Sequence, residues 1–220
     1  MGKVVLFGNK SAAREAYNDL AYFSGHEVVG FTVDRGYLDE EVLYALPVVP
    51  FDEVVRAFPP PQYQMLIAVG YTSVNRLRAE RYAQAKDMGY ELISFVSPRA
   101  TTYPGLQTGD NCRISHNAVI FQDVKIGNDV AIGAGTMIGH DVTIGDHCFL
   151  SSGVGLSGGV TVGPYCFMGT NATIRNRIQI GRECVIGAGA LVLEDLADRS
   201  VCLGTAAELL PISSERLSPP

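Results

Sequence analysis

Several features that mark common classes of protein are missing from this sequence. It has no run of basic residues, and a formal net charge of −6 argues against a nucleic-acid partner. Its apolar stretches are far shorter than the ~20 residues of a membrane-spanning helix, so membrane insertion is not expected. No hydrophobic segment with a cleavage site follows the first residues, so we do not expect secretion either. With 47% hydrophobic and 18% charged residues, the chain is expected to be well packed, in one or two domains.

A repeat of six residues, by contrast, runs from Cys112 to Leu193. Each sixth residue from Ile114 onward is apolar, and the residue two places before it is small or β-branched. A period of six fits neither an α-helix nor a pleated strand. It predicts a left-handed parallel β-helix over residues 98–205, in which three hexads close one triangular coil. The inward-pointing anchors are Ile114, Ile120, Ile126, Ile132, Ile138, Ile144, Leu150, Leu156, Val162, Met168, Ile174, Ile180, Ile186 and Val192.

The repeat also predicts where the cysteines lie. Residues eighteen apart should stack on successive coils at about 4.8 Å, the ordinary spacing of strands. Cys112, Cys148, Cys166 and Cys184 occupy the small inward position of their hexads and differ by 36, 18 and 18. We therefore predict one column of buried, reduced thiols, which favours a cytoplasmic location.

No metal site is predicted from these residues. The cysteines form no CxxC motif and no Cys/His pair with the spacing of zinc ligands. His116, His140 and His147 are separated by 24 and 7 residues, so no two of them share a column, and a zinc site needs about three such ligands. Convergence of histidines across an interface between chains is the alternative that this spacing leaves open.

Residues 1–97 lack the period of six and alternate between strand and helix patterns. This alternation predicts a parallel sheet and a Rossmann-like α/β subdomain. The expected strands are Lys3–Phe7, Glu27–Val33, Met65–Val69 and Glu91–Phe95. The first expected helix is capped by Ser11 and ended by Gly25, and the other two are Glu53–Phe58 and Ser73–Met88.

Ligands of such sheets bind beyond the carboxyl ends of the strands. Those ends carry Gly8-Asn9-Lys10-Ser11, Asp34-Arg35 and Gly70-Tyr71-Thr72-Ser73, and a helix N-terminus behind a glycine turn suits a phosphate. The GxGxxG spacing is missing, so an intact dinucleotide site is not expected. Ordinary strand-to-helix turns are the alternative.

Irregular stretches flank the repeat. Ser97–Gly109 is expected to be a connector into the β-helix, and Ser200–Gly204 its last strand. Residues 206–220 are expected to form a C-terminal tail with one short helical stretch and a loose Pro219-Pro220 end.

One histidine is placed to act as a base. His140 follows Ile138 and Gly139 at an outer corner of the predicted β-helix, and Gly158 lies eighteen residues further on. If the backbone N–H of Gly158 is exposed beside the imidazole of His140, the imidazole can act as a base and the N–H as a hydrogen-bond donor to an oxyanion. Asp141 can fix the imidazole tautomer and raise its basicity. A solvated corner histidine without a function is the alternative that spacing alone leaves open.

A small Rossmann-like domain joined to an uninterrupted left-handed β-helix resembles the bacterial nucleotide-sugar N-acetyltransferases. That family acts on bacillosamine- and perosamine-type precursors and is similar to the sialic-acid O-acetyltransferases. The run Gly135–Gly145, which contains His140, carries the likeness, together with Leu156–Val160 and Val185–Ala190. The resemblance covers nearly the whole chain.

The resemblance implies a CoA-dependent acyltransferase that N-acetylates the amino group of a nucleotide-linked amino-deoxy sugar, with acetyl-CoA as donor and without a metal. It also implies a homotrimer with three active sites between neighbouring β-helices. In that family's scheme the catalytic residues would be His140 as general base with Asp141; the CoA contacts would be Gly158, Thr170 and Ala188; and the nucleotide-sugar contacts would be Asn9, Lys10, Asp34, Gly70 and Tyr71.

The sequence departs from the family at three places. Gly8-Asn9-Lys10-Ser11-Ala12 stands where the family often has Gly-x-Gly-His-Gly, Phe149 stands where some members have a second histidine, and Gly204-Thr205-Ala206-Ala207 replaces Gly-Asn-Pro-Ala. Two alternatives therefore remain: a sugar O-acetyltransferase, and a non-catalytic trimeric module that binds a nucleotide sugar. An amine gives up its proton far more easily than an alcohol, which favours N-acetylation.

Overall fold

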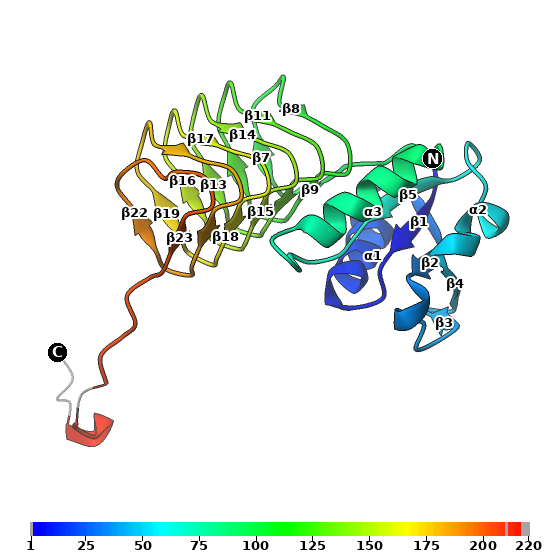
Figure 1. Ribbon diagram of the computed structural model, residues 1–220, viewed down its shortest axis with the longest axis horizontal. Helices are drawn as coiled ribbons and strands as arrows, with labels where there is room; N and C mark the ends of the chain where they lie inside the picture. Colours follow the sequence, from blue (N-terminus) through cyan, green and yellow to red (C-terminus); the bar gives the residue numbers. More distant parts are fainter. Residues whose placement is uncertain (1, 210, 217–220) are drawn as a thin grey trace.

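The computed structural model describes residues 2–209 and 211–216 and contains two parts of different architecture (Figure 1). Residues 2–94 form an α/β domain, here called the N-domain. From Phe95 onward the chain winds into a β-helix of short parallel strands, as predicted. After the last coil, residues 205–209 and 211–216 extend away from both parts (Figure 1).

No helix within the described ranges has both the length and the apolar character needed to cross a bilayer.

The N-domain is built on a five-stranded sheet with the strand order β3-β4-β2-β1-β5. All of its pairs are parallel except β3 with β4. Because β1, β2 and β5 run in the same direction, their carboxyl ends lie along one edge, where such sheets bind ligands. The elements are β1 (Lys3–Phe7), α1 (Ser11–Phe23), β2 (Glu27–Val33), η1 (Arg35–Tyr37), β3 (Val42–Leu43), β4 (Leu46–Pro50), η2 (Phe51–Glu53), α2 (Val54–Ala57), β5 (Gln64–Ile67) and α3 (Arg76–Asp87).

The hairpin of β3 and β4 was not expected from the sequence. Pro47 and Pro50 weaken the strand pattern of β4, since proline lacks the N–H that a central strand needs. β4 nevertheless extends the sheet beside β2, with Phe31 opposite Val48. The two strands are joined by Tyr44 and Ala45, which both have left-handed φ values (52° and 59°).

Three expected boundaries in the N-domain were wrong. Helix α1 has Lys10, not Ser11, at its N-cap position, and no side chain caps it. Helix α3 begins at Arg76, because Ser73–Asn75 have left-handed φ values of 53–65°. The expected strand at Glu91–Phe95 is reduced to a bridge between Leu92 and Met65, since Phe95 already pairs with the β-helix.

The β-helix is a triangular prism made of three parallel sheets. Its strands are two residues long, and strands eighteen residues apart pair, as Ile120 does with Ile138 and Ile138 with Leu156. All fourteen anchors point inward and are at most 5% exposed, which confirms the prediction made from the six-residue period.

We call the three sheets I, II and III in the order in which the chain visits them after β6. Sheet I contains β7 (Thr101–Thr102), β10 (Val119–Ile120), β13 (Met137–Ile138), β16 (Gly155–Leu156), β19 (Thr173–Ile174) and β22 (Leu191–Val192). Sheet II contains β8 (Gln107–Thr108), β11 (Lys125–Ile126), β14 (Thr143–Ile144), β17 (Thr161–Val162) and β20 (Gln179–Ile180). Sheet III contains β6 (Phe95–Val96), β9 (Arg113–Ile114), β12 (Ala131–Ile132), β15 (Phe149–Leu150), β18 (Phe167–Met168), β21 (Val185–Ile186) and β23 (Val201–Cys202).

The corners of the prism share one backbone form. One residue of each hexad is left-handed, for example Asp129, Asp141 and Arg177, with φ values of 55°, 58° and 60°. The glycine that follows an anchor has a different purpose. A Cβ on Gly139 would lie 2.6 Å from the backbone nitrogen of Gly158 on the next coil, so this glycine is needed for the close approach of two corners.

The ends of the β-helix differ from the expectation. Ser97–Gly109 is not a mere connector, because it contains β7 and β8 and forms most of the first coil. The last strand is confined to Val201–Cys202. The short helical stretch of the tail is the 3₁₀ turn η3 (Ser214–Arg216), and Pro219-Pro220 lie outside the described residues.

The predicted column of thiols is present in the core. Cys112, Cys148, Cys166 and Cys184 are fully buried, and none of the five cysteines forms a disulfide. Each of the four donates to a backbone carbonyl, as Cys112 Sγ does to Gly127 O at 3.1 Å. Burial raises the pKa of the Cys112 thiol to about 12. These thiols act as small core groups.

A buried polar network joins the N-domain to the β-helix. Arg78 on α3 lies 3.0 Å (Nε–Oδ1) from Asp129, and the two side chains are 3% and 0% exposed. Its Nη2 donates to the carbonyls of Asp129 (3.0 Å) and Cys148 (3.1 Å). Asp129 also accepts a hydrogen bond from Asn111 (2.7 Å) and pairs with His147 Nδ1 (2.8 Å). Every charged group in the network therefore has several partners, as burial requires.

Two asparagines extend this network to both sides. Asn75, at the start of α3, donates to the carbonyl of Cys166 at 3.0 Å and accepts from Arg78 at 3.2 Å. Asn111 exchanges two hydrogen bonds with the backbone of Ile67 in β5. The N-domain sheet and helix α3 are consequently fixed to the same corner of the prism, between sheets II and III.

Replacing Arg78 with alanine leaves the Asp129 carboxylate buried without its cation. We expect the Arg78→Ala variant to lose about 3–5 kcal/mol of unfolding free energy, measured by urea denaturation. Arg182→Ala is the matched control, because that guanidinium pairs with Glu183 at the surface and its loss should change stability little. Equal losses in the two variants would contradict the role given to the buried pair.

The burial of the thiols predicts their reactivity. Only a thiolate reacts, and Cys202 alone among the five is not buried. We expect one fast-reacting thiol per folded chain with a disulfide reagent at mildly alkaline pH, and four that react only on unfolding. The fast phase should vanish in Cys202→Ser. A second fast thiol in that variant would show that the column is open to solvent.

Candidate active site

His140 and Asp141 form a pair at an exposed corner between sheets I and II. His140 Nδ1 lies 2.7 Å from Asp141 Oδ2, and the side chains are 58% and 64% exposed. Asp141 is the left-handed residue of its hexad, so the chain turns there toward β14. Donation of the Nδ1 hydrogen to the carboxylate leaves Nε2 free to accept a proton.

Gly158 lies beside this imidazole on the next coil, as the spacing of eighteen residues predicts. A Cβ on Gly158 would be only 2.6 Å from His140 Nε2 and 2.7 Å from its Cε1. The N–H of Gly159 donates to the carbonyl of His140 at 2.9 Å and holds the two corners in register. Within the described ranges the Gly158 N–H donates to no group, so an unpaired donor and a ring nitrogen share this corner.

A hollow of about 230 Å³ lies at the carboxyl ends of β1, β2 and β5. Four of the five expected nucleotide-sugar contacts line it: Asn9, Lys10, Asp34 and Gly70. Asn9 Nδ2 donates to the carbonyl of Tyr37 at 2.8 Å, which fixes the loop after β1. We call this space the N-domain hollow. Its walls combine apolar side chains with backbone at the start of α1.

Tyr71 faces a second hollow of about 220 Å³ on the outside of sheet III. Its ring packs on Phe167 (centroids 4.4 Å apart) and Phe149 (5.2 Å). Thr170 lines the same space, which we call the sheet III hollow. Since Gly70 and Thr72 line the N-domain hollow, the segment 70–72 connects the two spaces.

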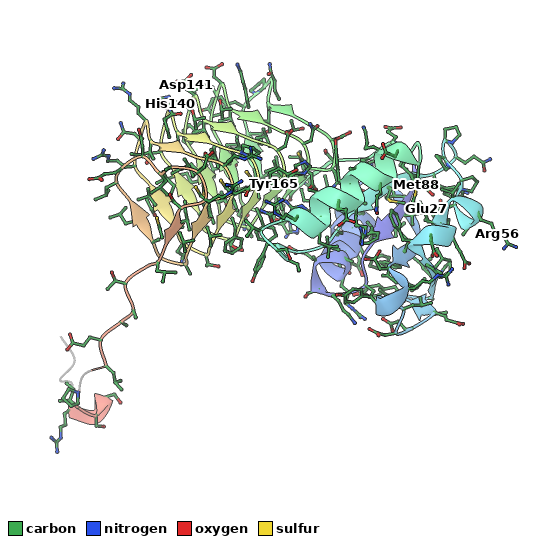
Figure 2. The ribbon with its side chains drawn as sticks, viewed as in Figure 1. Glu27, Arg56, Met88, His140, Asp141 and Tyr165 are labelled. Carbon is green, nitrogen blue, oxygen red and sulfur yellow. The ribbon has the colours of Figure 1, made fainter. Side chains whose placement is uncertain are left out.

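Thr170 and Ala188 stack at the corner between sheets III and I. The N–H of Gly189 donates to Thr170 O at 2.8 Å, and these two residues lie on adjacent coils. His140 is at the opposite edge of sheet I. Figure 2 shows His140 and Asp141 on the β-helix, at the end of the molecule away from Glu27, Arg56 and Met88 of the N-domain. One chain therefore places Gly158 beside His140, but it does not bring His140 together with the other predicted binding residues.

The other two histidines of the β-helix have different partners. His116 Nε2 is 3.3 Å from Asp19 Oδ1, and His147 Nδ1 is 2.8 Å from Asp129 Oδ2. Among the residues that the structure describes, no group of three or more His, Cys, Asp or Glu side chains could hold a metal ion.

Two features of the hollows were not found from the sequence. Arg81 on α3 binds both carboxylate oxygens of Asp34, with Nε–Oδ1 at 2.9 Å and Nη2–Oδ2 at 3.0 Å. Arg113, which lines the sheet III hollow, pairs with Glu15 (3.2 Å) and Asp19 (3.6 Å) of α1.

Burial raises the pKa of Asp19, and the charge of Arg113 opposes that rise. The spacing of Glu15 and Asp19 by four residues does place them on one face of a helix. Nothing in the sequence, however, indicated that Arg113 lies opposite them.

Two family models match the repeats. The bacterial transferase hexapeptide model (six repeats) matches residues 123–158, and the hexapeptide repeat of succinyl-transferase matches residues 105–140 and 159–194. A search of curated protein sequences gives no match.

Solved structures similar to this chain share its whole architecture. A mutant of perosamine N-acetyltransferase from Caulobacter crescentus, in complex with CoA and GDP-perosamine, superposes with a TM-score of 0.85 at 27% identity. The match covers 93% of this chain and 94% of that one. The acetyltransferase domain of PglB from Neisseria gonorrhoeae, in complex with acetyl coenzyme A, matches with a TM-score of 0.80 over 94% and 98% of the two chains; at 23% identity it supports the fold alone.

Proposed function

Because this chain belongs to the hexapeptide-repeat nucleotide-sugar N-acetyltransferases, we propose that His140 is the general base of its acetyl transfer. The observation that carries the proposal is the corner where the imidazole of His140, bonded to Asp141 through Nδ1, presents Nε2 to Gly158. The reaction is the CoA-dependent N-acetylation of a nucleotide-linked amino sugar.

The corner supplies what this reaction needs. The sugar amine attacks the thioester carbonyl, a C–N bond forms, and His140 Nε2 accepts a proton from the nitrogen. The negative charge on the carbonyl oxygen is stabilised by the Gly158 N–H, which has no other partner among the described residues. The C–S bond then breaks, and the proton passes from His140 to the CoA sulfur. Asp141 holds the Nδ1–H tautomer and stabilises the imidazolium.

The nucleotide sugar is assigned to the N-domain hollow. Asn9, Lys10, Asp34 and Gly70 line it, and the start of α1 offers backbone N–H groups to a diphosphate. A sugar linked to that diphosphate reaches the sheet III hollow past Tyr71, where Thr170 also lies. The complex of perosamine N-acetyltransferase with CoA and GDP-perosamine supports a donor and acceptor of this class.

A trimer completes the site. His140 and the sheet III hollow lie on different faces of one prism, so the base must come from a neighbouring chain. Between two faces packed by threefold symmetry, the His140 corner of one chain adjoins sheet III of the next. Thr170 and Ala188 then flank the acyl-CoA from the side opposite Gly158. The reduced thiols favour a cytoplasmic location for this enzyme.

The role of His140 is tested by following the release of free CoA thiol from acetyl-CoA with a panel of nucleotide-linked amino sugars. We expect His140→Ala to lower kcat about 10²–10⁴-fold, because proton transfer by a positioned base contributes that much. Asp141→Asn should retain the imidazole but lose its orientation, with a smaller decrease. His116→Ala, which alters a histidine paired with Asp19 elsewhere, serves as the control. Unchanged thiol release by His140→Ala would rule out the proposed mechanism.

The sharing of sites between chains is tested by complementation. Gly70→Phe is designed to fill the N-domain hollow, since no atom lies within 4 Å of a Cβ at Gly70. His140→Ala and Gly70→Phe should each be inactive as pure trimers. Co-expressed and mixed at random, they should recover about a quarter of the native activity, because one site in four then combines an intact hollow with an intact base. No recovery in verified mixed trimers would mean that hollow and base belong to the same chain.

A further inference from the structure

The corner that carries His140 changes its charge along the prism. On the coil before His140 the corner holds Gln122 and Asp123, and beyond Gly158 and Gly159 it holds Arg175, Asn176 and Arg177. The backbone connects these coils directly: Gly159 N donates to His140 O at 2.9 Å, and Arg177 N donates to Gly158 O at 3.0 Å. The two arginines therefore stand two coils from the base on the same edge.

Arg175 and Arg177 differ from the arginines of the prism that form ion pairs, and from Arg99, whose guanidinium lies over the ring of Phe23 at 4.8 Å. Arg113 pairs with Glu15 and Asp19, and Arg182 and Arg199 both pair with Glu183. In the ranges that the structure describes, neither Arg175 nor Arg177 has a carboxylate partner, and both are exposed. Two unneutralised guanidinium groups side by side on a chain of net charge −6 indicate an anionic ligand.

The side chain of Arg177 is placed by a glycine. A Cβ on Gly159 would lie 3.3 Å from Arg177 Cγ, so the aliphatic part of Arg177 extends over Gly159, on the coil of Gly158. The nearest acidic residues on this corner are on the following coil. Of these, Asp195 accepts the N–H of Gln179 at 2.8 Å, and Glu194 precedes it in the chain. Neither forms an ion pair with the two arginines in the described part of the chain.

We propose that Arg175 and Arg177 bind the phosphates of the acyl-CoA whose thioester lies at His140. This inference rests on the proposed function and assigns the polar end of the donor site. Two coils span about 10 Å, to which an arginine adds its own length. The pantetheine arm has about thirteen bonds between sulfur and diphosphate, which is roughly 15 Å when extended at the rise per bond of a polypeptide.

The charge of the corner also decides the direction of the donor. From His140 toward the C-terminal coils the diphosphate reaches two guanidinium groups, which bind phosphate oxygens in pairs. In the opposite direction it would meet Asp123, which lines a hollow of about 350 Å³ together with Asp141 and one cation, Lys125. Two carboxylates and one ammonium group are less favourable to a diphosphate than two guanidinium groups without carboxylate partners, so the acyl-CoA runs toward Arg175.

The test uses the full-length protein and removes either the arginines or the phosphates. In Arg175→Gln/Arg177→Gln we expect KM for acetyl-CoA to rise about 10–100-fold, since hydrogen bonds to charged groups contribute on the order of 1.5–3 kcal/mol. kcat should change far less, because neither guanidinium reaches the reacting atoms. With acetyl-pantetheine, which has no phosphates, the native protein and this variant should have the same KM.

Arg182→Gln/Arg199→Gln is the matched control. It removes the same charge from another corner, where both arginines pair with Glu183, and should leave KM for acetyl-CoA unchanged. The proposal is overturned if both double variants raise KM equally, if neither does, or if the effect of Arg175→Gln/Arg177→Gln persists with acetyl-pantetheine.

Calorimetric binding of CoA separates this proposal from the proposed function. If no sugar is acetylated but CoA binds in a manner that depends on Arg175 and Arg177, the phosphate site stands and the acetyl transfer fails. If the sugar is acetylated and the arginines do not affect CoA binding, the acetyl transfer stands and the phosphate site fails.

Discussion

The arrangement of the molecule depends on one buried ion pair, that of Arg78 with Asp129. An isolated ion in such a place would be strongly destabilising, and each oxygen and guanidinium nitrogen of the pair is therefore provided with further partners. Those partners belong to the start of α3 and to three coils of the prism, and one of them, Asn111, also exchanges hydrogen bonds with Ile67 of β5. A rotation of the N-domain would break several of these hydrogen bonds at once. The pair thus sets the orientation in which the N-domain presents its hollow.

Orientation matters here because the two functional regions are on different elements. The N-domain hollow and the sheet III hollow are joined through Tyr71, whereas His140 is fixed to a separate edge of the prism. The proposed function brings them together by the addition of a second chain, and a β-helix suits this because its sides are flat and its corners repeat at a constant spacing. Under the proposed function, the catalytic geometry is a property of the assembly.

The sequence predicted the β-helix almost completely, because a period of six over fourteen anchors fits neither an α-helix nor a plain pleated strand and favours the β-helix over any other solenoid of parallel strands. The same six-residue spacing predicted the column of thiols and the contact of His140 with Gly158.

Prediction from the sequence failed where the geometry depends on contacts between residues that are distant in the sequence. β4 was not predicted because Pro47 and Pro50 interrupt its strand pattern, although it pairs with β2 in the sheet. The pairs Arg78–Asp129 and Arg81–Asp34 could not be found, since residues about 50 positions apart share no local signal. The strands of the first coil were not predicted because Thr101–Thr102 and Gln107–Thr108 lack the large anchors of later coils.

The six-residue repeat, with one corner in each hexad, has an evolutionary consequence. Since one hexad makes one side and one corner, an insertion of six residues would preserve strands and core but turn every later residue onto the next side of the prism. Only whole coils of eighteen residues could be added or lost while His140, Gly158 and Arg177 remained on a common edge. Changes in length within this β-helix are therefore tolerated in units of a coil, and the distance along that edge can vary only in steps of one strand spacing.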